Sequence, residues 1–265
     1  MSARPPEARG ARRPESARNR KILFLCSIGV AVGLGGMIVT AQQDDGTAAV
    51  TDQSGQRTYA VADFDKISAV AAPDVVVSVG QGFSVRGAGG ARALDRFEIV
   101  VDDAELKIQP KHSAWWGLPW SHVRPATFYV TLPQISAASF VGSGEMKIDR
   151  VEGPRFAATV AGSGHMDIAA LAVDDADFSL AGSGDLSVRG RARSAHVSVA
   201  GSGDMKGADL TSDSADVSMV GSGDASLTVN GQADVSIVGS GDVTVGGSGH
   251  CKISRLGSGD VNCPT

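Results

Sequence analysis

Apolar and polar residues alternate along most of the second half of the chain. Residues 197–199 have the sequence Val-Ser-Val, and residues 186–188 have the sequence Leu-Ser-Val. An alternation with a period of two predicts a β-strand that buries one face and exposes the other. Short glycine-rich stretches separate these segments, and glycine tolerates the positive φ angles of a sharp corner. The pattern therefore predicts short strands joined by tight corners.

The corners recur at a nearly constant interval. A Gly-Ser-Gly triplet begins at seven positions that lie 20, 20, 19, 20, 18 and 18 residues apart, and a further triplet begins at Gly247. A period near this length is typical of a solenoid, whereas the blades of a β-propeller need roughly 40 residues or more. The predicted structural corner glycines are Gly142, Gly144, Gly162, Gly164, Gly182, Gly184, Gly201, Gly203, Gly221, Gly223, Gly239, Gly241, Gly257 and Gly259.

The predicted fold is all-β: a single-stranded β-solenoid, similar to a right-handed parallel β-helix, with 18–20 residues per turn. An isolated strand pair cannot bury its apolar face, so each strand pairs with its equivalent in the next turn, roughly 4.8 Å away. We expect the triplets to align along one edge of the stack. Strands in the less regular part before the repeat are expected to form the first turns and to cap the stack. They cover residues 67–79, 83–85, 97–101, 106–108 and 128–132.

Four features carry a resemblance to a known family. They are the segments Phe64–Ile67, Val75–Gly82 and Leu106–Ile108 and the repeated Gly-Ser-Gly-Asp. These residues resemble the autotransporter adhesin head domain, also called the head GIN domain, over about residues 59–260. The resemblance implies a β-helical protein of the cell envelope, with no recognised catalytic residues to carry over. The chain departs from the family pattern in a tryptophan-rich insert and in Glu145 and His165, where later repeats have aspartate.

The N-terminal region has the pattern of an export segment. Residues 1–21 carry a net charge of +5, and residues 22–39 are uncharged and almost entirely apolar. Such a run is just long enough to cross a bilayer as a helix, with its basic flank in the cytoplasm. Residues 22–41 are therefore predicted to be a transmembrane anchor or a cleaved signal peptide, with the remainder of the chain beyond the membrane. Residues 42–58 are predicted to be a flexible linker, and residues 59–265 the solenoid domain.

Charge and composition narrow the choice of partners. The chain has a net charge of −5, so the part that follows residue 21 carries −10. An acidic body argues against a nucleic-acid partner, because phosphate binding needs clustered cations. Aromatic residues make up only 5% of the chain, which suits a thin core stacked along an axis.

An acidic column is predicted beside the corners. The residues that follow the triplets are Glu145, His165, Asp185, Asp204, Asp224, Asp242 and Asp260. In one interpretation each aspartate accepts hydrogen bonds from backbone N–H groups of its own corner, as aspartate does in turns. In the other, the column binds Ca²⁺, which prefers carboxylate and carbonyl oxygens. We favour the first interpretation, because the spacing differs from that of known calcium-binding repeats.

Cysteines and tryptophans complete the set of candidate residues. Cys251 and Cys263 flank the last corner in a compartment that permits disulfides, so we expect them to be bonded to each other. Cys26 follows Leu25, which does not suit a lipoprotein signal, and is interpreted as part of the apolar run. Trp115, Trp116 and Trp120 are either a ligand-contacting loop or a hydrophobic lid over the solenoid.

The sequence favours a binding protein over an enzyme. It contains no His-Glu-x-x-His spacing, no Cys-His zinc pattern and no nucleophile-elbow motif. We therefore expect no catalytic, cofactor or metal site, and a module that binds an envelope polysaccharide or another surface protein. Membrane contact is expected only through the N-terminal segment. The open alternative is a polysaccharide-acting β-helix enzyme, a lyase or hydrolase, in which carboxylates and an arginine or lysine would converge on a cleft.

Overall fold

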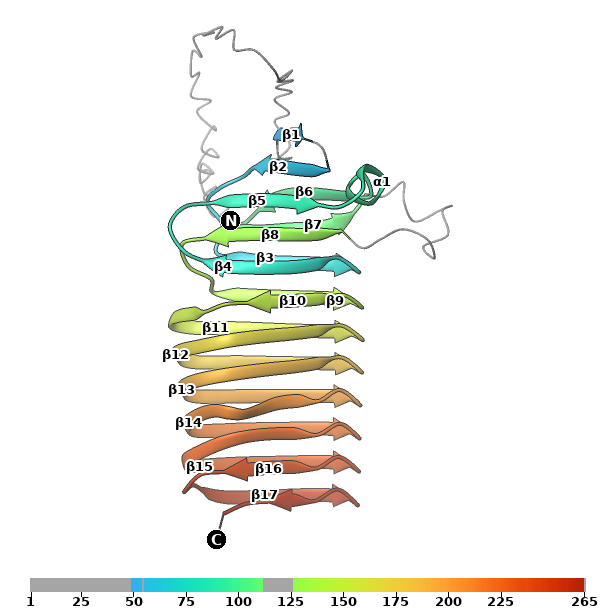
Figure 1. Ribbon diagram of the computed structural model, residues 1–265. Helices are drawn as coiled ribbons and strands as arrows, with labels where there is room; N and C mark the ends of the chain where they lie inside the picture. The colour runs from blue at the N-terminus through green and yellow to red at the C-terminus, as the bar shows by residue number, and fades with distance from the viewer. Residues whose placement is uncertain (1–48, 54, 112–125, 265) are drawn as a thin grey trace, which may run out of the picture. The chain divides into compact units, whose positions relative to one another are not determined.

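The computed structural model describes residues 49–53, 55–111 and 126–264 of the chain. The chain divides into two compact units, Met1–Met37 and Ile38–Thr265, and all described residues lie in the second unit. These residues form one hydrogen-bonded sheet of 18 strands that winds into a β-solenoid (Figure 1).

Parallel strands stack coil on coil through the repeat region (Figure 1). Each coil contains a strand before the Gly-Ser-Gly corner, a strand after it, and a return segment that leads to the next corner. The strands β12 to β15 are long because each runs through a return segment without a break. The strands of this region are β9 (Ala137–Gly142), β10 (Glu145–Ile148), β11 (Val151–Gly162), β12 (His165–Gly182), β13 (Asp185–Gly201), β14 (Met205–Gly221), β15 (Ala225–Gly239), β16 (Val243–Gly246), β17 (His250–Gly257) and β18 (Val261–Asn262).

Successive coils are in register at the corner. The first glycines of the seven triplets pair with one another in the order Gly142, Gly162, Gly182, Gly201, Gly221, Gly239 and Gly257. These triplets therefore line one edge of the stack. The further triplet at Gly247 lies in a return segment instead, where the N–H of Gly249 donates to the carbonyl oxygen of Val229 at 2.9 Å.

Columns of apolar side chains fill the interior of the coils. The alternation seen in the sequence places one apolar residue per coil at each inward position, and stacking puts like positions on top of one another. One such column, before the corner, contains Phe140, Val160, Leu180, Val199, Met219 and Ile237, all of them buried. Another, after the corner, contains Met146, Met166, Leu186, Met205, Ala225 and Val243. The core is thin, as the scarcity of aromatic residues predicts.

The first coil of the stack has a corner without glycine. Strands β3 (Lys66–Ala71) and β4 (Asp74–Val79) pair directly with β9 and β10. The single strand predicted over residues 67–79 is therefore wrong: the chain bends at Ala71, whose φ is 84°, and at the two residues that follow it. Ala71 is in register with Gly142, so a corner forms here although the sequence lacks the triplet that marks the others.

A cap of mixed strand direction covers this first coil. The chain begins the cap with β1 and β2, forms β3 and β4, completes the cap, and only then returns to add β9 and β10 on the opposite side of the same coil (Figure 1). Sequence order and spatial order therefore differ, and the strands before the repeat are not simply successive early turns. The cap contains β1 (Ala49–Gln53), β2 (Gln56–Ala60), β5 (Ser84–Ala88), α1 (Ala91–Leu94), β6 (Phe97–Asp102), β7 (Glu105–Pro110) and β8 (Thr127–Leu132).

Antiparallel pairs distinguish the cap from the coils. The pairs β1–β2, β2–β5, β5–β8 and β6–β7 are all antiparallel. The rings of Phe97 and Phe128 pack edge to face, 5.4 Å apart, inside the cap. The β1–β2 hairpin lies largely within residues 42–58, for which the sequence predicts a linker, and ends at Ala60. It forms because β5 offers β2 a free edge for backbone hydrogen bonds, which a composition-based prediction cannot register.

The predicted membrane segment lies outside the described residues. In the described ranges, no helix is long and apolar enough to cross a membrane. The hydrophobic helix expected over residues 22–41 and the basic stretch before it therefore stay predictions.

Candidate functional site

The corner edge is a ridge of closely stacked backbone. The φ of Gly221 is 139°, and a Cβ atom added to it would overlap the carbonyl oxygen of Gly201 in the preceding coil. A Cβ atom on Gly223 would overlap the carbonyl oxygen of Gly203 in the same way. The N–H of Ser222 donates to the carbonyl oxygen of Gly201 at 2.8 Å. The glycines are therefore required by both backbone conformation and close approach, which makes the ridge a structural feature.

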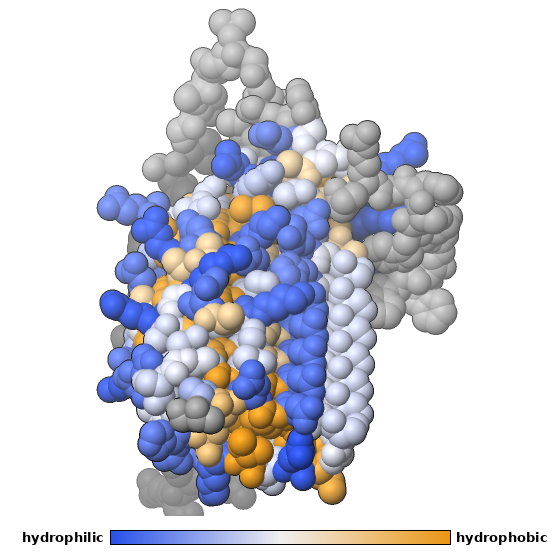
Figure 2. Space-filling view, turned by 60° about the horizontal axis from the view of Figure 1, so that its bottom comes forward, coloured by the Kyte–Doolittle hydropathy of each residue, from blue (hydrophilic) through white to orange (hydrophobic). Residues whose placement is uncertain are grey.

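An aspartate ladder lies beside this ridge. Its members are Asp185, Asp204, Asp224, Asp242 and Asp260. The Oδ1 atom of each of the first four accepts a hydrogen bond from the backbone N–H of the next member, at 3.3, 3.1, 2.9 and 2.8 Å respectively. The prediction that each aspartate accepts a hydrogen bond from its own corner is therefore wrong, because the donor N–H belongs to the neighbouring coil. Figure 2 shows a hydrophilic column beside a pale column along the stack.

The two equivalent positions that lack aspartate show which acceptor the aspartate side chain replaces. Glu145 and His165 occupy the equivalent positions in the earlier coils, in register with Asp185. There, the backbone N–H of His165 donates to the carbonyl oxygen of Gly144 at 3.0 Å, and that of Asp185 donates to Gly164 at 3.1 Å. The backbone N–H thus finds a carbonyl where the preceding coil lacks aspartate. The aspartate side chain supplies an oxygen acceptor that takes the place of that carbonyl.

Some ladder members are also paired with a cation, Asp185 and Asp260 most closely. The Nζ atom of Lys206 lies 2.7 Å from Oδ2 of Asp185. This hydrogen bond lowers the pKa of Asp185 below its ordinary value, and the backbone N–H of Asp204 acts in the same direction. The same contact raises the pKa of Lys206. Among the described residues, no group of three or more histidine, cysteine, aspartate or glutamate side chains is arranged to hold a metal ion.

A column of hydroxyl groups lies on the sheet face formed by the strands that precede the corners. Alternation points these side chains outward, one in each coil, and in-register pairing aligns them. We call the set the hydroxyl column: Ser68, Ser139, Thr159, Ser179, Ser198, Ser218, Ser236 and Ser254. Within the described ranges, none of these hydroxyls has a hydrogen-bond partner, and those from Ser179 onward are exposed.

Two further columns flank the hydroxyl column on the same face. On the side nearer the corner, the outward residues are apolar, and Val220 and Leu256 are 54% and 71% exposed. On the other side, Asp177, His196 and Asp216 follow one another in register. We call these three residues the acidic column; they are distinct from the aspartate ladder beside the corners. A shallow groove of about 290 Å³ lies between the hydroxyl column and the acidic column and is lined by residues of both. This face offers acceptors, donors and apolar surface in parallel rows.

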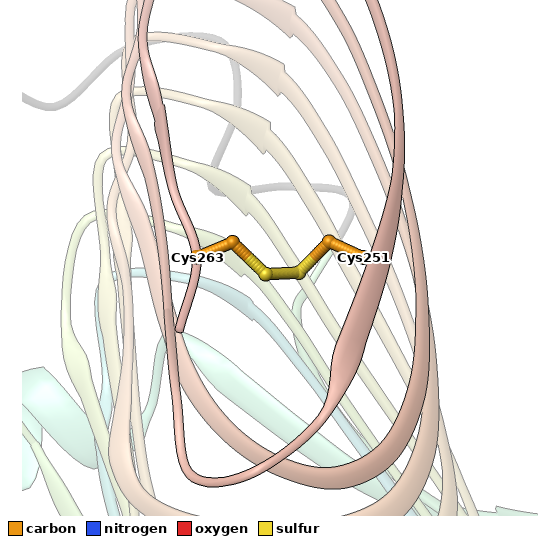
Figure 3. The surroundings of a disulfide bond; sticks show 2 residues. All are labelled: Cys251 and Cys263. Carbon is orange, nitrogen blue, oxygen red and sulfur yellow. A yellow bond between two sulfur atoms is a disulfide. The ribbon is translucent and has the colours of Figure 1, made fainter. Parts of the chain in front are cut away.

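A disulfide closes the C-terminal end of the stack. The sequence predicts a bond between Cys251 and Cys263, and the structure has this bond, with the two Cα atoms 6.5 Å apart. Figure 3 shows that it crosses the interior of the last coil and joins its two sides. Arg255 in this coil occupies an inward position, in register with the buried Ile237. Its guanidinium lies 2.7 Å from Asp260.

The remaining predicted residues do not converge on one site. Trp115, Trp116 and Trp120 lie outside the described residues, as do His112 and His122. His165, His196 and His250 belong to three different places, respectively the ladder position, the acidic column and the start of β17. The sequence pattern alone does not single out the hydroxyl column, although a hydroxyl residue between two inward positions recurs in every coil, as serine in all but one and as Thr159 in that one. That recurrence was interpreted only as the polar half of a strand pattern.

The comparisons agree with the architecture. The model of the family "Putative auto-transporter adhesin, head GIN domain" matches residues 63–249. A crystal structure of a "putative adhesin" from Bacteroides fragilis NCTC 9343 is 21% identical, covers 78% of this chain and 95% of that chain, and has a TM-score of 0.72. A "putative lipid binding protein" from Parabacteroides distasonis ATCC 8503 is 25% identical, with coverages of 78% and 95% and a TM-score of 0.64. No curated protein matches the chain. The described residues form a regular solenoid, and the family model matches most of the chain. The chain therefore belongs to the auto-transporter adhesin head GIN domain family.

Proposed function

We propose that the protein is a non-catalytic, adhesin-like module of the cell envelope that holds a hydroxyl-rich polysaccharide along its pre-corner sheet face. The observation that carries the proposal is the hydroxyl column. It presents one hydroxyl per coil to solvent, in register, and the described part of the chain provides none of these groups with a partner. A regular row of free donors and acceptors suits a polymer that is itself regular.

The columns beside the hydroxyls add the two other contacts that a sugar chain needs. Carboxylates such as Asp177 and Asp216 accept hydrogen bonds from sugar hydroxyls, and charged acceptors make the stronger bonds. The exposed valine side chains can cover the apolar faces of the sugar rings, because Val220 and Val238 are 54% and 43% exposed. Parallel coils repeat the hydroxyl roughly every 4.8 Å, and the carboxylates recur in some of these coils, so many weak contacts can add along one polymer.

The family and the N-terminal sequence support the location that this function requires. The chain belongs to an adhesin head-domain family. Residues 22–41 have the pattern of an anchor or signal peptide that would leave the solenoid beyond the membrane. The apolar column also fits a lipid, which is the ligand class in the description of the Parabacteroides distasonis protein. Polysaccharide is the first proposal because the unpartnered groups on this face are mainly polar.

The test compares two sets of serines in the same coils. In detergent, the full chain is titrated against dextran, cello-oligosaccharides and purified peptidoglycan. One variant combines Ser179→Ala, Ser198→Ala and Ser218→Ala in the hydroxyl column; its matched control combines Ser183→Ala, Ser202→Ala and Ser222→Ala on the corner ridge. We expect the first variant to lose binding to whichever polymer the wild type retains, and the control to keep it. Equal binding by both variants would remove the hydroxyl column from the function. Binding to phosphatidylglycerol in mixed detergent micelles, and to none of the polymers, would favour the lipid interpretation.

A further inference from the structure

Charges alternate from coil to coil along the return edge, by which we mean the return segments between successive corners. Asp174 and Asp175 lie in one coil, Arg189, Arg191 and Arg193 in the next, and Asp209 and Asp213 in the one after. Alternation is favourable because in-register stacking would otherwise place like charges beside one another. It also produces ion pairs across coils: Arg193 lies 3.7 Å from Asp174, and Arg189 lies 3.7 Å from Asp209.

Arg191 is the exception in its coil. Within the described ranges its guanidinium has no acidic partner, whereas Arg189 and Arg193 on either side of it are both paired. Its register neighbours in the adjacent coils are Ala172 and Thr211, neither of which carries charge. The side chain is exposed and is therefore free to meet an anion from solvent.

A hollow of about 420 Å³ lies around this arginine. Small side chains leave this space open. A Cβ atom added to Gly153 would meet nothing within 4 Å, and the side chain of Ala172 is a single methyl group. Thr211 and Asp213 also line the hollow, and Asp213 has no basic partner in the described part of the chain. A volume in the range of ligand sites thus contains a free guanidinium, a hydroxyl and a free carboxylate.

We propose that this hollow binds a carboxylate-bearing sugar, one uronic-acid unit of an otherwise neutral saccharide. The planar guanidinium of Arg191 matches a carboxylate and can bind it through two parallel hydrogen bonds. Thr211 and Asp213 accept hydrogen bonds from the ring hydroxyls. This inference rests on the proposed polysaccharide-binding function and names one sugar class for it.

The neighbouring coils limit the ligand to an isolated negative charge. Acidic residues occupy the return edge on both sides of the arginine coil, at Asp174 and Asp213. Arg193, the other arginine that lines the hollow, is already paired with Asp174, so a second carboxylate on the adjacent sugar would meet acidic side chains and no unpaired guanidinium. Like charges repel one another when they lie within the screening length, which is about 8 Å at physiological salt. The site is therefore expected to prefer a single uronate over a continuous polyuronate.

The experiment uses a disaccharide of glucuronic acid and glucose, with cellobiose as the neutral analogue and digalacturonate as the doubly charged one. Binding to the full chain in detergent is measured by saturation-transfer NMR titration. We expect Arg191→Gln to weaken binding of the glucuronyl disaccharide at least about tenfold. Arg155→Gln is the matched control, because Arg155 is exposed on the return edge two coils away but lies 3.8 Å from Asp175 and does not line the hollow. It should change the affinity less than about twofold.

The outcomes separate this inference from the proposed function. The uronate site would be overturned if both variants lost affinity for the glucuronyl disaccharide equally, or if Arg191→Gln lost none. It would also be overturned if the wild type bound cellobiose as tightly as the glucuronyl disaccharide. If the wild type binds a neutral polymer through the hydroxyl column but no uronate, the uronate site is wrong and the proposed function stands. If it binds neither, both are wrong. Tighter binding of digalacturonate than of the glucuronyl disaccharide would contradict the preference for an isolated charge.

Discussion

A single carboxylate oxygen joins each coil of the later repeats to the next. Oδ1 of Asp224 accepts the backbone N–H of Asp242 at 2.9 Å, and the N–H of Asp224 is itself bound by Asp204 at 3.1 Å. Each aspartate is thus both acceptor and donor in a chain that runs along the stack. The arrangement places negative charges close together, and the hydrogen bonds offset that repulsion. At Asp224, which has no basic partner in the described ranges, we expect the acceptor and not the charge to stabilise the stack.

Replacing Asp224 separates the acceptor from the charge. Asp224→Ala leaves the N–H of Asp242 without its protein partner, and we expect the free energy of unfolding to fall by about 1 kcal/mol, the usual net value of such a bond. Asp224→Asn keeps an oxygen acceptor and removes one charge from the column, so its stability should equal or exceed that of the wild type at low salt. Urea denaturation of both variants measures the difference. Equal destabilisation by the two would show that the charge itself is needed.

The pH dependence of stability should reflect Asp185. Its pKa is lowered in the folded state by Lys206, so its contribution is present above the ordinary aspartate pKa of 3.8 and is lost as the pH falls through the folded value. We expect the stability of Asp185→Asn, measured by urea midpoints, to fall less steeply over that acid range. Asp213→Asn removes an aspartate without a basic partner in the described ranges and should leave the slope unchanged. Identical slopes for both variants would contradict the account.

The end of a solenoid needs elements that the middle does not. A coil in the middle has a neighbour on each side, whereas the last coil exposes one edge and one layer of inward side chains. Ile253 is at such an inward position and is 48% exposed (Figure 2 shows hydrophobic atoms at this end). The disulfide and Arg255 both act on this coil. The disulfide ties the two sides of the coil together, and Arg255 places a charge where a further coil would need an apolar residue.

Reduction of the Cys251–Cys263 bond should loosen the last coil and leave the others unchanged. A closed loop of this size contributes roughly 2–3 kcal/mol in the chain-entropy model. In a stack that depends on nearest neighbours, this loss appears as local fraying. We expect faster amide hydrogen exchange in β17 and β18 after reduction, with β12 and β13 unaffected. The double variant Cys251→Ser, Cys263→Ser should behave in the same way without reductant. Unchanged exchange at the C-terminal end would mean that the bond has no stabilising role.

Arg255 is expected to prevent end-to-end association. Its guanidinium pairs with Asp260 and donates to the carbonyl oxygen of Gly259 at 3.0 Å, which places charge over an otherwise apolar end. Arg255→Ile would extend the inward apolar column to the open edge, and sedimentation velocity should then show dimers or longer assemblies. Lys252→Ile changes an outward residue of the same strand and serves as the control. A monomeric Arg255→Ile variant, or equal association of the control, would contradict this role.

For the whole molecule, the repeat region could be predicted from the sequence and the cap could not. Period-two alternation and the Gly-Ser-Gly interval are local patterns, so they predict strands, corners and the pairing of each coil with the next. The first corner, at Ala71, has no glycine, and the pairing of β3 with β9 joins segments about 70 residues apart. Neither feature leaves a local signal. The ladder bonds and the unpaired Arg191 likewise depend on which residues stacking brings together, and this is known only once the register is known.

The central claim is that the stacked coils hold a polymer without cutting it, and the dependence of affinity on polymer length tests it most directly. The full chain is titrated with oligosaccharides of increasing length from the polymer that it binds, and the polymer is sized after prolonged incubation with the protein. Contacts repeated along the hydroxyl column predict an affinity that rises with each added sugar until the oligosaccharide spans the coils, with no change in polymer size. An affinity independent of length, or shortening of the polymer, would contradict the account; shortening would instead favour a polysaccharide-acting enzyme.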